Sequence, residues 1–401
     1  MLIEPGLPPS SVGVAVTPAP LQVAMVAGEA SGDLLAGLLL DGMKAKWPAL
    51  VAYGIGGSHM QARGFKAWWP HDKLAVHGYS WEVLRRYREI VGIRSELKAR
   101  LLTDPPPVFI GVDAPDFNLA LEANLRAAGV KTVHFVSPSV WAWRPERVEK
   151  IKRSVDHVLC IFPFEPAFLA QHGIESTYVG HPLANVIPMR PDRSQARAAL
   201  GLSDSDQVVA ILPGSRESEI KHLALRFFQA AALIALAKPA TKFIVPTVPS
   251  LVDQVKHAAH KSGFSDHLQI LCGQSHTALA ACDVTLIASG TATLEAALFK
   301  RPMVIAYHMS WLSWQIMRRK QLQPWVGLPN ILCQTFVVPE LLQEQATPQA
   351  LARETLLWLA NDPASSEKIS RLVDTFIALH HELQRDTPQL AAHAIEQVLQ
   401  G

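Results

Sequence analysis

The sequence predicts an α/β protein with two parallel-sheet domains, and three features lead to this prediction. Along most of the 401 residues, short apolar runs alternate with longer stretches of helical spacing, as they do in strand–helix–strand units. The chain is also too long for one ordinary hydrophobic core. The alternation stops once, over residues 182–206, which are rich in proline and charge. We therefore expect two domains and, between them, a cleft in which ligands bind at the carboxyl ends of strands.

The predicted strands are short apolar runs separated by stretches of helical spacing, such as 34–47 and 121–129. Strands in this arrangement belong to parallel sheets that helices cover on both faces. In chain order the predicted strands are residues 21–28, 107–114, 131–137, 156–163, 208–214, 243–248, 268–273, 284–289 and 302–307. After Pro339 only helices are expected, beginning at the Thr347 cap, near Ser365 and after Thr387.

This pattern divides the chain into four parts. Residues 1–20 are a loose tail that lacks the charged start and the uninterrupted apolar stretch of a secretory signal. Residues 21–190 form the first α/β domain and residues 200–345 the second. Residues 346–401 form C-terminal helices that we expect to pack across the two domains.

The composition excludes several classes of protein. Hydrophobic residues make up 49% of the chain and charged residues 18%, which is typical of a globular protein. A net charge of +2 gives no overall field that would require nucleic acid. The four cysteines are scattered and form no CxxC pair, which favours buried thiols in a reducing cytosol. The most apolar helical stretch, from Phe227, has about half the length of a membrane span, so we expect a soluble or surface-bound protein.

The stretch GVDAPDFN, residues 111–118, places two carboxylates where a buried strand ends. Pro115 disfavours a helical conformation at Ala114 and so ends the strand. Asp116 can then cap or charge the start of the next helix, which is a structural role. Asp113 has no such role. It ends the strand at the mouth of the cleft, where a partly desolvated carboxylate can act as a general base.

Two other turns of the first domain carry candidate ligand contacts. In AGEASGD the glycines permit a close backbone approach, and Ser31 can cap the following helix. Glu29 favours a functional turn over a plain one, since a cap alone needs no carboxylate there. In VSPSVWAWR, Trp141 and Trp143 either belong to the core or stack on a sugar or an acyl chain.

The second domain offers an anion site at the ends of two predicted strands. In PGSRESEI, Arg216 stands at a helix start, where its charge opposes the helix dipole unless an anion is bound there. In SGTATLE, small residues from Ser289 expose the amides of another helix start, which is typical of a phosphate cradle. Glu295 lies about one and a half turns into that helix. It either binds both hydroxyls of a ribose or is an ordinary helix carboxylate.

The sequence predicts no bound metal or cofactor. Asp204, Ser205 and Asp206 resemble a DxD metal site, but they lie in the polar linker, so a turn is expected. No HxxxH or HExxH pair falls on a predicted helix. His181 lies in a loop, where it either contacts a substrate or is satisfied within the protein. Arg216 and the helix amides are expected to neutralise a diphosphate without a metal.

Two segments are typical of helices that lie on a membrane surface. YSWEVLRRYREIVGI, from Tyr79, and WLSWQIMRRKQLQPW, from Trp311, place aromatic and apolar residues beside clustered arginines. Each cation near anionic lipid adds roughly 1 kcal/mol, although basic amphipathic helices are more often simply half-buried. The candidate membrane and acyl-chain contacts are Trp81, Leu84, Arg85, Arg86, Arg88, Trp314, Arg318 and Arg319.

The order of these motifs resembles one enzyme family along nearly the whole chain from about Leu21. AGEASGD, GIGGSHMQARGF, GVDAPDFN, VSPSVWAWR, PFE, VGHP, LPGSR, ASGTATLE and LPN occur in the order seen in the lipid-A-disaccharide synthases. VSPSVWAWR and DAPDFN are specific to that family, whereas SGTATLE and PGSR are shared with other nucleotide-sugar glycosyltransferases. The resemblance implies an α/β GT-B fold, with two Rossmann-like domains facing across a cleft and C-terminal helices.

The resemblance also implies a reaction that needs no cofactor. It would join UDP-2,3-diacylglucosamine to 2,3-diacylglucosamine 1-phosphate (lipid X), giving the β(1→6) lipid A disaccharide 1-phosphate and UDP. The first domain would bind the acceptor and the second the UDP-sugar. Asp113 matches the family's catalytic aspartate and would take the proton of the acceptor's 6-hydroxyl as that oxygen displaces UDP with inversion. The candidate substrate contacts are Glu29, Ser31, Asn118, Trp141, Trp143, Arg216, Ser289, Gly290, Thr291, Glu295 and Asn330.

The same resemblance implies a location and partners. The family works peripherally at the cytoplasmic face of the bacterial inner membrane, and its members can form homodimers by exchanging C-terminal elements. Two rival functions remain open at this point. Another GT-B enzyme acting on UDP-N-acetylglucosamine, an epimerase or peptidoglycan transferase, would not need the two aromatic–basic segments. A non-catalytic lipid-binding protein would not need Arg216, SGTATLE and Asp113 together.

Overall fold

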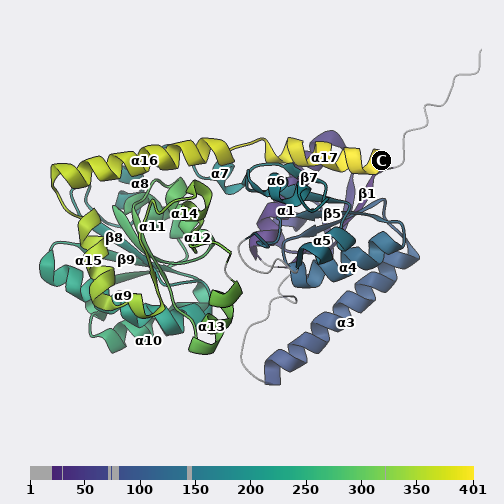
Figure 1. Ribbon diagram of the computed structural model, residues 1–401. Coiled ribbons are helices and arrows are strands. Elements are labelled where there is room, and N and C mark those ends of the chain that lie inside the picture. The colour runs from purple at the N-terminus through teal and green to yellow at the C-terminus, as the bar shows by residue number, and fades with distance from the viewer. Residues whose placement is uncertain (1–19, 29, 71–73, 75–80, 142–146, 321) are drawn as a thin grey trace, which may run out of the picture.

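The computed structural model describes residues 20–401 apart from residues 29, 71–73, 75–80, 142–146 and 321. Two parallel sheets form the centres of two domains, which lie side by side in Figure 1. The central strands of both sheets are buried along their whole length, because helices cover both faces. The predicted α/β fold with two Rossmann-like domains is therefore confirmed.

The first sheet has the strand order β3-β2-β1-β4-β5-β6-β7. The chain runs outward from β1 to β3 and returns to the other side of β1 with β4, so the strand order reverses between β1 and β4. Ligands bind in the crevice at such a switch point. The strands are β1 (Gln22–Ala27), β2 (Val51–Gly56), β3 (Lys66–Pro70), β4 (Val108–Val112), β5 (Lys131–Phe135), β6 (His157–Cys160) and β7 (Ser176–Tyr178).

The second sheet repeats this plan with the order β10-β9-β8-β11-β12-β13. Here the strand order reverses between β8 and β11, which pair in parallel. Each domain therefore has one switch point, and we expect each to contribute one wall of a ligand site. The strands are β8 (Val208–Leu212), β9 (Lys242–Thr247), β10 (Leu268–Cys272), β11 (Val284–Ala288), β12 (Met303–Tyr307) and β13 (Glu340–Leu342).

Helices connect the strands and cover the sheets. Those of the first domain are α1 (Ala30–Lys46), α2 (Ser58–Gln61), α3 (Trp81–Thr103), α4 (Pro115–Ala127), α5 (Val148–Ser154) and α6 (Glu165–Ala170). The proline-rich segment holds α7 (Leu183–Val186) and α8 (Arg193–Ala199) and no strand, as predicted. The second domain has α9 (Glu217–Ala237), α10 (Val252–Ser262), α11 (Ser275–Ala281), α12 (Thr291–Leu298), α13 (Trp311–Lys320) and α14 (Leu328–Cys333). The C-terminal helices are α15 (Pro348–Trp358), α16 (Pro363–Leu383) and α17 (Thr387–Gln400).

The sequence patterns missed four strands. β2 has alternating glycines, β3 carries two tryptophans, and β7 and β13 have only three residues each, so none forms an apolar run of usual length. The expectation that only helices follow Pro339 was wrong, because β13 pairs with β12 at the edge of the second sheet. The Thr347 cap was predicted correctly, since its side chain accepts a hydrogen bond from the backbone N–H of Ala350 at 3.2 Å.

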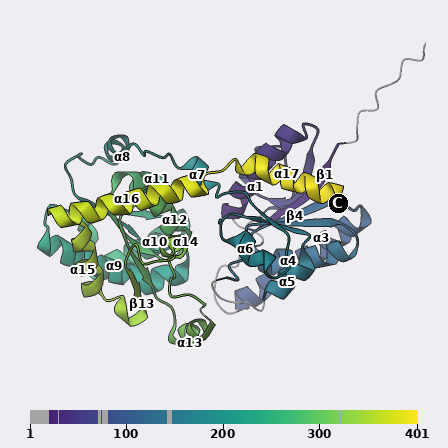
Figure 2. The same ribbon diagram turned by 45° about the horizontal axis from the view of Figure 1, so that its top comes forward.

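The last two helices tie the domains together. In Figures 1 and 2, α16 lies along the second domain and α17 along the first. α17 packs on α1 at Gly42, where a Cβ would lie 2.2 Å from the carbonyl oxygen of Pro388. At the end of α16, the Leu383 carbonyl accepts a hydrogen bond from the backbone N–H of His181 at 2.9 Å. The C-terminal segment thus spans the connection between the domains.

Helix α9 is longer than its apolar stretch predicted. It has 21 residues, and its hydropathy over an 18-residue window would allow it to cross a membrane. However, Ile220, Leu223, Phe227 and other residues of one face are buried in the protein, and the helix packs against α10 and α15. This arrangement is that of a core helix, although length and composition alone do not exclude a span.

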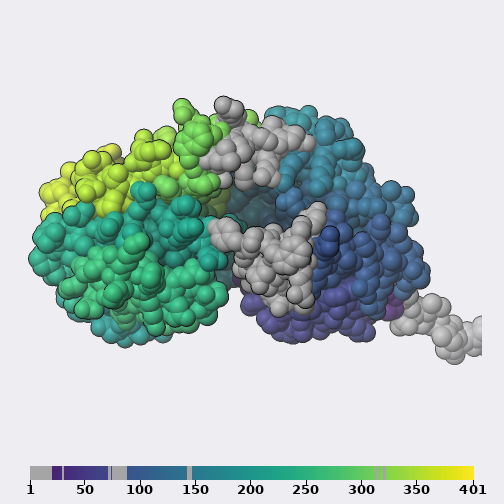
Figure 3. Space-filling model, turned by 90° about the horizontal axis from the view of Figure 1, so that it is seen from below, coloured from purple at the N-terminus to yellow at the C-terminus, as the bar shows by residue number. Residues whose placement is uncertain are grey.

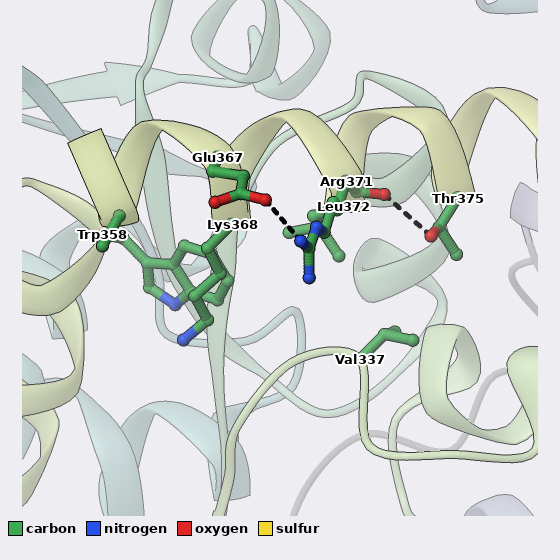
Figure 4. Close-up of a pocket in the computed structure, with 8 residues that line it drawn as sticks. Val337, Trp358, Glu367, Lys368, Arg371, Leu372 and Thr375 are labelled. Atoms are coloured by element: carbon green, nitrogen blue, oxygen red, sulfur yellow. Dashed lines mark hydrogen bonds and ion pairs between the residues drawn. The ribbon is translucent and has the colours of Figure 1, made fainter.

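A small hollow of about 300 Å³ lies on the outer side of α16 and is drawn in Figure 4. The ammonium group of Lys368 lies 4.1 Å from the centre of the Trp358 ring, and Arg371 pairs with Glu367 one turn along the helix. None of the residues that the sequence marks as functional lines this hollow. We therefore place the functional site elsewhere.

Candidate active site

A cleft of about 860 Å³ lies between the two domains, and residues from both switch points line it. Figure 3 shows this side of the molecule, hollowed between the blue first domain and the green second domain. The first domain contributes the turns after β4 and β5, including Asp113 and Ser137. The second contributes the helix starts after β8 and β11, at Arg216 and Thr291. Motifs more than 100 residues apart in the printed sequence thus face one space.

Asp113 lies directly after β4, half-buried in the wall of the cleft. Its backbone N–H donates to the carbonyl of Phe135 at 2.9 Å, which ties the turn to the end of β5. Asp113 and Ala114 have φ values of 51° and 44°, and Val136 after β5 has 77°. Positive φ is costly for residues with a Cβ, most of all for β-branched valine. Strain of this kind persists where the surroundings fix the backbone, and it clusters at functional sites.

The surroundings of the Asp113 turn supply that constraint. Asn118 is fully buried, and its Nδ2 donates to the Asp113 carbonyl at 2.8 Å. On the other side, a Cβ at Gly28 would lie 2.7 Å from the Cβ of Ala114, so only glycine permits this close approach. Asn118 was expected to contact substrate, but it does not line the cleft. It holds the backbone of the turn instead.

Asp116 lies in the first turn of α4, where it complements the helix dipole. It does not cap the helix, because the N-cap residue is Ala114 in a left-handed conformation. Its exposed carboxylate accepts a hydrogen bond from Arg147 at 2.8 Å, and both residues line the cleft. The sequence analysis missed Arg147, which precedes α5 and has no strand end or glycine turn to mark it.

Trp141 faces the interior and not the open cleft. Its indole N–H donates to the carboxylate of Glu165 at 3.0 Å, and its ring packs edge-on against Phe164. Glu165 also accepts hydrogen bonds from the backbone N–H groups of Ile161 and Phe162, at 3.1 and 3.0 Å. Burial raises the pKa of Glu165 to about 8, against the lowering effect of these three donors. Of the two alternatives for this tryptophan, the structure favours a core position.

The AGEASGD turn and the second tryptophan are described only in part. Ser31 is exposed and lines the cleft, inside the first turn of α1, so it is not the cap that was expected. Glu29 and Trp143 lie outside the described residues.

Arg216 is the N-cap of α9, as the sequence predicted, and its side chain is 73% exposed in the cleft wall. The turn amides that were expected to bind an anion already have a partner. The Glu219 carboxylate accepts from the N–H groups of Ser215 and Arg216, at 2.8 and 3.2 Å. The guanidinium of Arg216 lies 3.7 Å from the same carboxylate and remains free to turn toward a ligand. The group at this turn that is available to an anion is thus the side chain.

Helix α12 begins at the cleft with Thr291, and its N-cap is Gly290. No side chain of the described residues caps it, so its first amides are available to an anion. The Ser289 hydroxyl donates to the Val326 carbonyl at 2.8 Å and supports the turn from behind. Glu295 lines the cleft one turn further on, and His276 at the start of α11 approaches its carboxylate at 3.4 Å. The sequence analysis did not identify His276.

Asn330 does not reach the cleft. It is fully buried, and its Nδ2 donates to the carboxylate of Glu340 at 2.8 Å. Glu340 also accepts from the backbone N–H groups of Val326 and Gly327, both at 2.9 Å. Asn330 therefore fixes the loop before α14, whose Leu328 does line the cleft. Its expected contact with substrate stays a prediction.

His181 forms part of the cleft floor near the connection between the domains. It is 4% exposed, and its Nδ1 accepts a hydrogen bond from the Leu183 N–H at 3.2 Å. Its ring lies 5.7 Å from that of Phe162, centre to centre. Burial lowers the pKa of His181 to about 4, so the ring is neutral at physiological pH. Of the two alternatives for this histidine, the packing supports a structural role within the protein. One edge of its ring nevertheless lines the cleft.

The two aromatic–basic segments form helices α3 and α13, which both lie on the lower side in Figure 1. Trp311 is 68% exposed, Arg88 and Arg318 are exposed, and Trp314 is half-buried. The side chains of Trp81, Leu84, Arg85, Arg86 and Arg319 lie outside the described residues. Two further apolar side chains, Leu322 and Phe336, are 54% and 60% exposed in the same domain as α13.

Within the described part of the chain, no three His, Cys, Asp or Glu residues lie close enough to hold a metal ion. Besides the Asp116–Arg147 pair, the cleft thus offers the carboxylate of Asp113 on a fixed turn, the guanidinium of Arg216, an open helix start and the carboxylate of Glu295 with a histidine beside it. These groups can accept a proton, bind a diphosphate and bind hydroxyl groups.

Comparisons with known proteins extend this description. The sequence model of the family described as lipid-A-disaccharide synthetase matches residues 23–395. The chain is 76% identical over 381 residues to the lipid-A-disaccharide synthase of Albidiferax ferrireducens, covering 95% of this chain and 98% of that one. It is 64% identical over 381 residues to the enzyme of the same name from Verminephrobacter eiseniae, with coverage of 95% and 98%.

Solved structures with little sequence identity share the fold. The UDP-GlcNAc 2-epimerase of Neisseria meningitidis bound to UDP-GlcNAc superposes with a TM-score of 0.64 at 11% identity, covering 95% of this chain and 100% of that one. The glycotransferase of kitacinnamycin gives a TM-score of 0.58 at 16% identity, with coverage of 95% and 100%. With the family model matching almost the whole chain and close relatives of one name, this protein belongs to the lipid-A-disaccharide synthase family of glycosyltransferases.

Proposed function

We propose that this enzyme joins UDP-2,3-diacylglucosamine to 2,3-diacylglucosamine 1-phosphate, giving the β(1→6) lipid A disaccharide 1-phosphate and UDP. The observation that carries the proposal is the single cleft of about 860 Å³ in which Asp113 of one domain faces the α12 start and Arg216 of the other. One switch point supplies a proton acceptor and the other supplies anion-binding groups. A transfer from a nucleotide sugar to a hydroxyl needs both of these on opposite sides of the sugar.

The donor's diphosphate binds at the start of α12 in this proposal. Its charge meets the free amides after Gly290 and the positive end of the helix dipole. The exposed guanidinium of Arg216 turns from Glu219 to the phosphates, which offer it a better-matched anion. Glu295 and His276 lie next to this position, where the carboxylate binds the ribose hydroxyls. No cofactor takes part.

Asp113 acts as the general base toward the acceptor. It takes the proton of the acceptor's 6-hydroxyl as that oxygen attacks the anomeric carbon on the side opposite UDP. The carbon–oxygen bond to UDP breaks in the same step, so an α-linked donor gives a β-linked product. The strained and tightly held turn supports this role, because a base must stay aligned with the attacking hydroxyl.

The enzyme works at the cytoplasmic face of the bacterial inner membrane in this proposal, held by α3 and α13. Both substrates carry acyl chains, and the exposed apolar side chains Trp311, Leu322 and Phe336 belong to the domain that carries α13. Aromatic residues beside arginines suit the interface of an anionic membrane.

We also propose that the chain can form a homodimer by exchanging α17. This helix rests on α1 through the close contact at Gly42, and a short connection of residues 384–386 joins it to α16. The same surface of α1 can accept α17 of a second copy. Light scattering would detect this dimer, and a molar mass of one chain at all protein concentrations would contradict the exchange.

The reaction itself is tested by incubating the purified protein with UDP-2,3-diacylglucosamine and lipid X and weighing the product by mass spectrometry. The expected result is a disaccharide monophosphate formed in step with UDP. Two parallel incubations separate the alternatives. Turnover of UDP-N-acetylglucosamine alone would indicate an epimerase or a transferase of water-soluble sugars, and acyl-lipid binding without affinity for UDP would indicate a lipid-binding protein.

A further inference from the structure

A buried pair of titratable side chains lies behind the Asp113 turn. Glu122 on α4 and His134 on β5 are both fully buried, and Glu122 Oε1 lies 2.8 Å from His134 Nδ1. The helix face that carries Glu122 also carries the buried Asn118, and Leu121 and Leu125 of the same helix lie in the core. A buried ion pair seldom adds stability compared with well-packed apolar residues. Its presence here therefore calls for a reason other than the stability of the fold.

The backbone is built to admit this pair. Gly111 is the partner of His134 in the register of β4 and β5. A Cβ at Gly111 would lie 2.1 Å from Glu122 Oε1 and 2.9 Å from the Cβ of Asn118, so any other residue would force α4 away from the sheet. The strand that lacks a side chain at Gly111 ends at Val112, and Asp113 follows it directly. The room for Glu122 and the position of Asp113 are thus set by the same strand.

The elements that carry the pair also hold the backbone of Asp113. Asn118, one turn before Glu122 on α4, binds the carbonyl of Asp113, and Phe135, next to His134, accepts from its N–H. Burial alone would lower the pKa of His134, but the charges of Glu122 and Asp113 outweigh it and raise the pKa above its usual value. Among the described residues, these two carboxylates are the charged groups that act on His134, one from α4 and one from the end of β4.

We propose that His134 is a positioning residue that carries a positive charge between two carboxylates, Asp113 at the cleft and Glu122 in the core. This inference rests on the proposed role of Asp113 as the base. His134 touches neither substrate nor UDP and exchanges no proton in the reaction. Its charge balances that of Asp113, so the carboxylate remains ready to accept a proton although it is half-buried, and Glu122 keeps the imidazole charged and oriented.

The charge arrangement makes a prediction in which two neighbouring substitutions act in the same direction but to different extents. His134→Asn keeps a donor near Nδ1 but removes the positive charge. The acid limb of the kcat/KM profile should then move up by about one pH unit, the low end of the effect of a nearby opposite charge. Glu122→Gln removes the carboxylate that keeps the imidazole charged, so the acid limb should also move up, but by less, because Asp113 still raises the pKa of His134. The double variant should resemble His134→Asn, since no imidazole charge is left for Glu122 to hold.

The outcome separates a charge effect from a packing effect. Loss of packing would lower kcat in both single variants without moving the acid limb. That result, or an acid limb that moves further in Glu122→Gln than in His134→Asn, would overturn the proposal. Asp113→Asn serves as the separate test of the base. If that variant keeps its activity, the proposed function of Asp113 is wrong, whatever the other profiles show.

A second measurement does not depend on changing a buried residue. In protein labelled with ¹³C-histidine, the buried His134 signal should titrate at a lower pH in Asp113→Asn than in the wild type, because one of its two negative neighbours is gone. Asp116→Asn, which removes an exposed carboxylate from the same loop, is the matched control and should leave the titration unchanged. An equal titration in wild type and Asp113→Asn would show that the two groups do not interact and would overturn the proposal.

Discussion

The two walls of the cleft are built in different ways. The wall of the first domain is held from within, with positive φ at Asp113, Ala114 and Val136 and buried polar side chains beneath the turn. The wall of the second domain presents loosely held groups. Arg216 has a side chain that is 73% exposed, and α12 begins with amides that no described side chain caps.

This difference matches the chemistry that each wall is proposed to perform. A general base must lie within hydrogen-bond distance of one proton, so a small displacement lowers the rate strongly. A diphosphate, in contrast, offers many oxygens, and a mobile arginine can reach them from several positions. Rigid backbone is therefore expected where a proton moves, and adaptable side chains where charge is bound.

The largest effect is expected at the rigid wall. Asp113→Asn keeps the shape of the side chain and removes the proton acceptor, so kcat should fall by about 10²–10⁴-fold. UDP affinity and melting temperature should barely change, because the nucleotide is proposed to bind to the other domain. Steady-state kinetics and calorimetry with UDP measure the two properties.

The control for this substitution is Asp116→Asn in the same loop. Asp116 is 78% exposed and pairs with Arg147, so its loss should leave most of the activity. An inactive Asp116→Asn beside an active Asp113→Asn would mean that the two carboxylates have been assigned in the wrong order. Equal, severe losses of melting temperature in both would mean that the turn is only structural.

At the adaptable wall, Arg216→Ala should weaken UDP binding. A hydrogen bond to a charged group contributes roughly 1.5–3 kcal/mol, which corresponds to a loss of about 10–150-fold in affinity. Arg353→Ala on α15, whose side chain is 69% exposed, is the matched control and should bind UDP like the wild type. Calorimetry that finds the same affinity in both variants would remove Arg216 from the site.

Binding of the protein to membranes should depend on the exposed apolar side chains near α13 and not on exposed apolar side chains elsewhere. Replacing Trp311, Leu322 and Phe336 by serine should move protein from anionic vesicles to the soluble fraction in a flotation assay, with an unchanged melting curve. Each apolar side chain is expected to contribute about 1.5–3 kcal/mol when it enters the lipid. Leu236→Ser on α9, where the leucine is 80% exposed, is the control. Equal loss of binding in this control would show that the surface is not specific.

The smallest effect is expected on the stability of the folded protein at low pH and concerns His181 in the cleft floor. Because burial lowers the pKa of His181 to about 4, the folded protein resists protonation that the unfolded chain accepts near its usual pKa of about 6.5. The buried His181 therefore does not reduce the free energy of unfolding above about pH 6.5. As the pH drops toward 4, this group lowers the free energy of unfolding, by up to about 2 kcal/mol at pH 5.

His181→Asn should therefore flatten the dependence of melting temperature on pH between about 6.5 and 4. His257→Asn on α10, which replaces an exposed histidine, should leave the slope unchanged. If the slope of His181→Asn equals that of the wild type, the burial of His181 does not control the acid response.

The sequence predicted the sheets well where a strand was a long apolar run, and it missed strands that are short or rich in glycine and tryptophan. Residues directly after the central strands, such as Asp113, Arg216 and Thr291, do lie in the cleft, since both switch points open there. Asn118 and Asn330 lie near these motifs in sequence but point into the protein. Sequence position does not reveal which face of a helix a side chain takes.

Other parts of the site depend on contacts that no local pattern encodes. His276 meets Glu295 only because α11 and α12 begin side by side, and Glu219 occupies the turn amides that were expected to bind the anion. The buried pair of Glu122 and His134 required both the register of β4 with β5 and the space above Gly111. Such features follow from three-dimensional packing between distant segments.

The central claim is that a base on one wall and a diphosphate site on the other act on opposite sides of the same sugar. The most direct test is the proton NMR spectrum of the product formed from α-linked UDP-2,3-diacylglucosamine and lipid X. Inversion predicts a new anomeric proton with the large coupling of a β linkage, joined to the 6-position of the acceptor. A small coupling, which indicates an α linkage, would contradict the account, and so would the absence of a disaccharide.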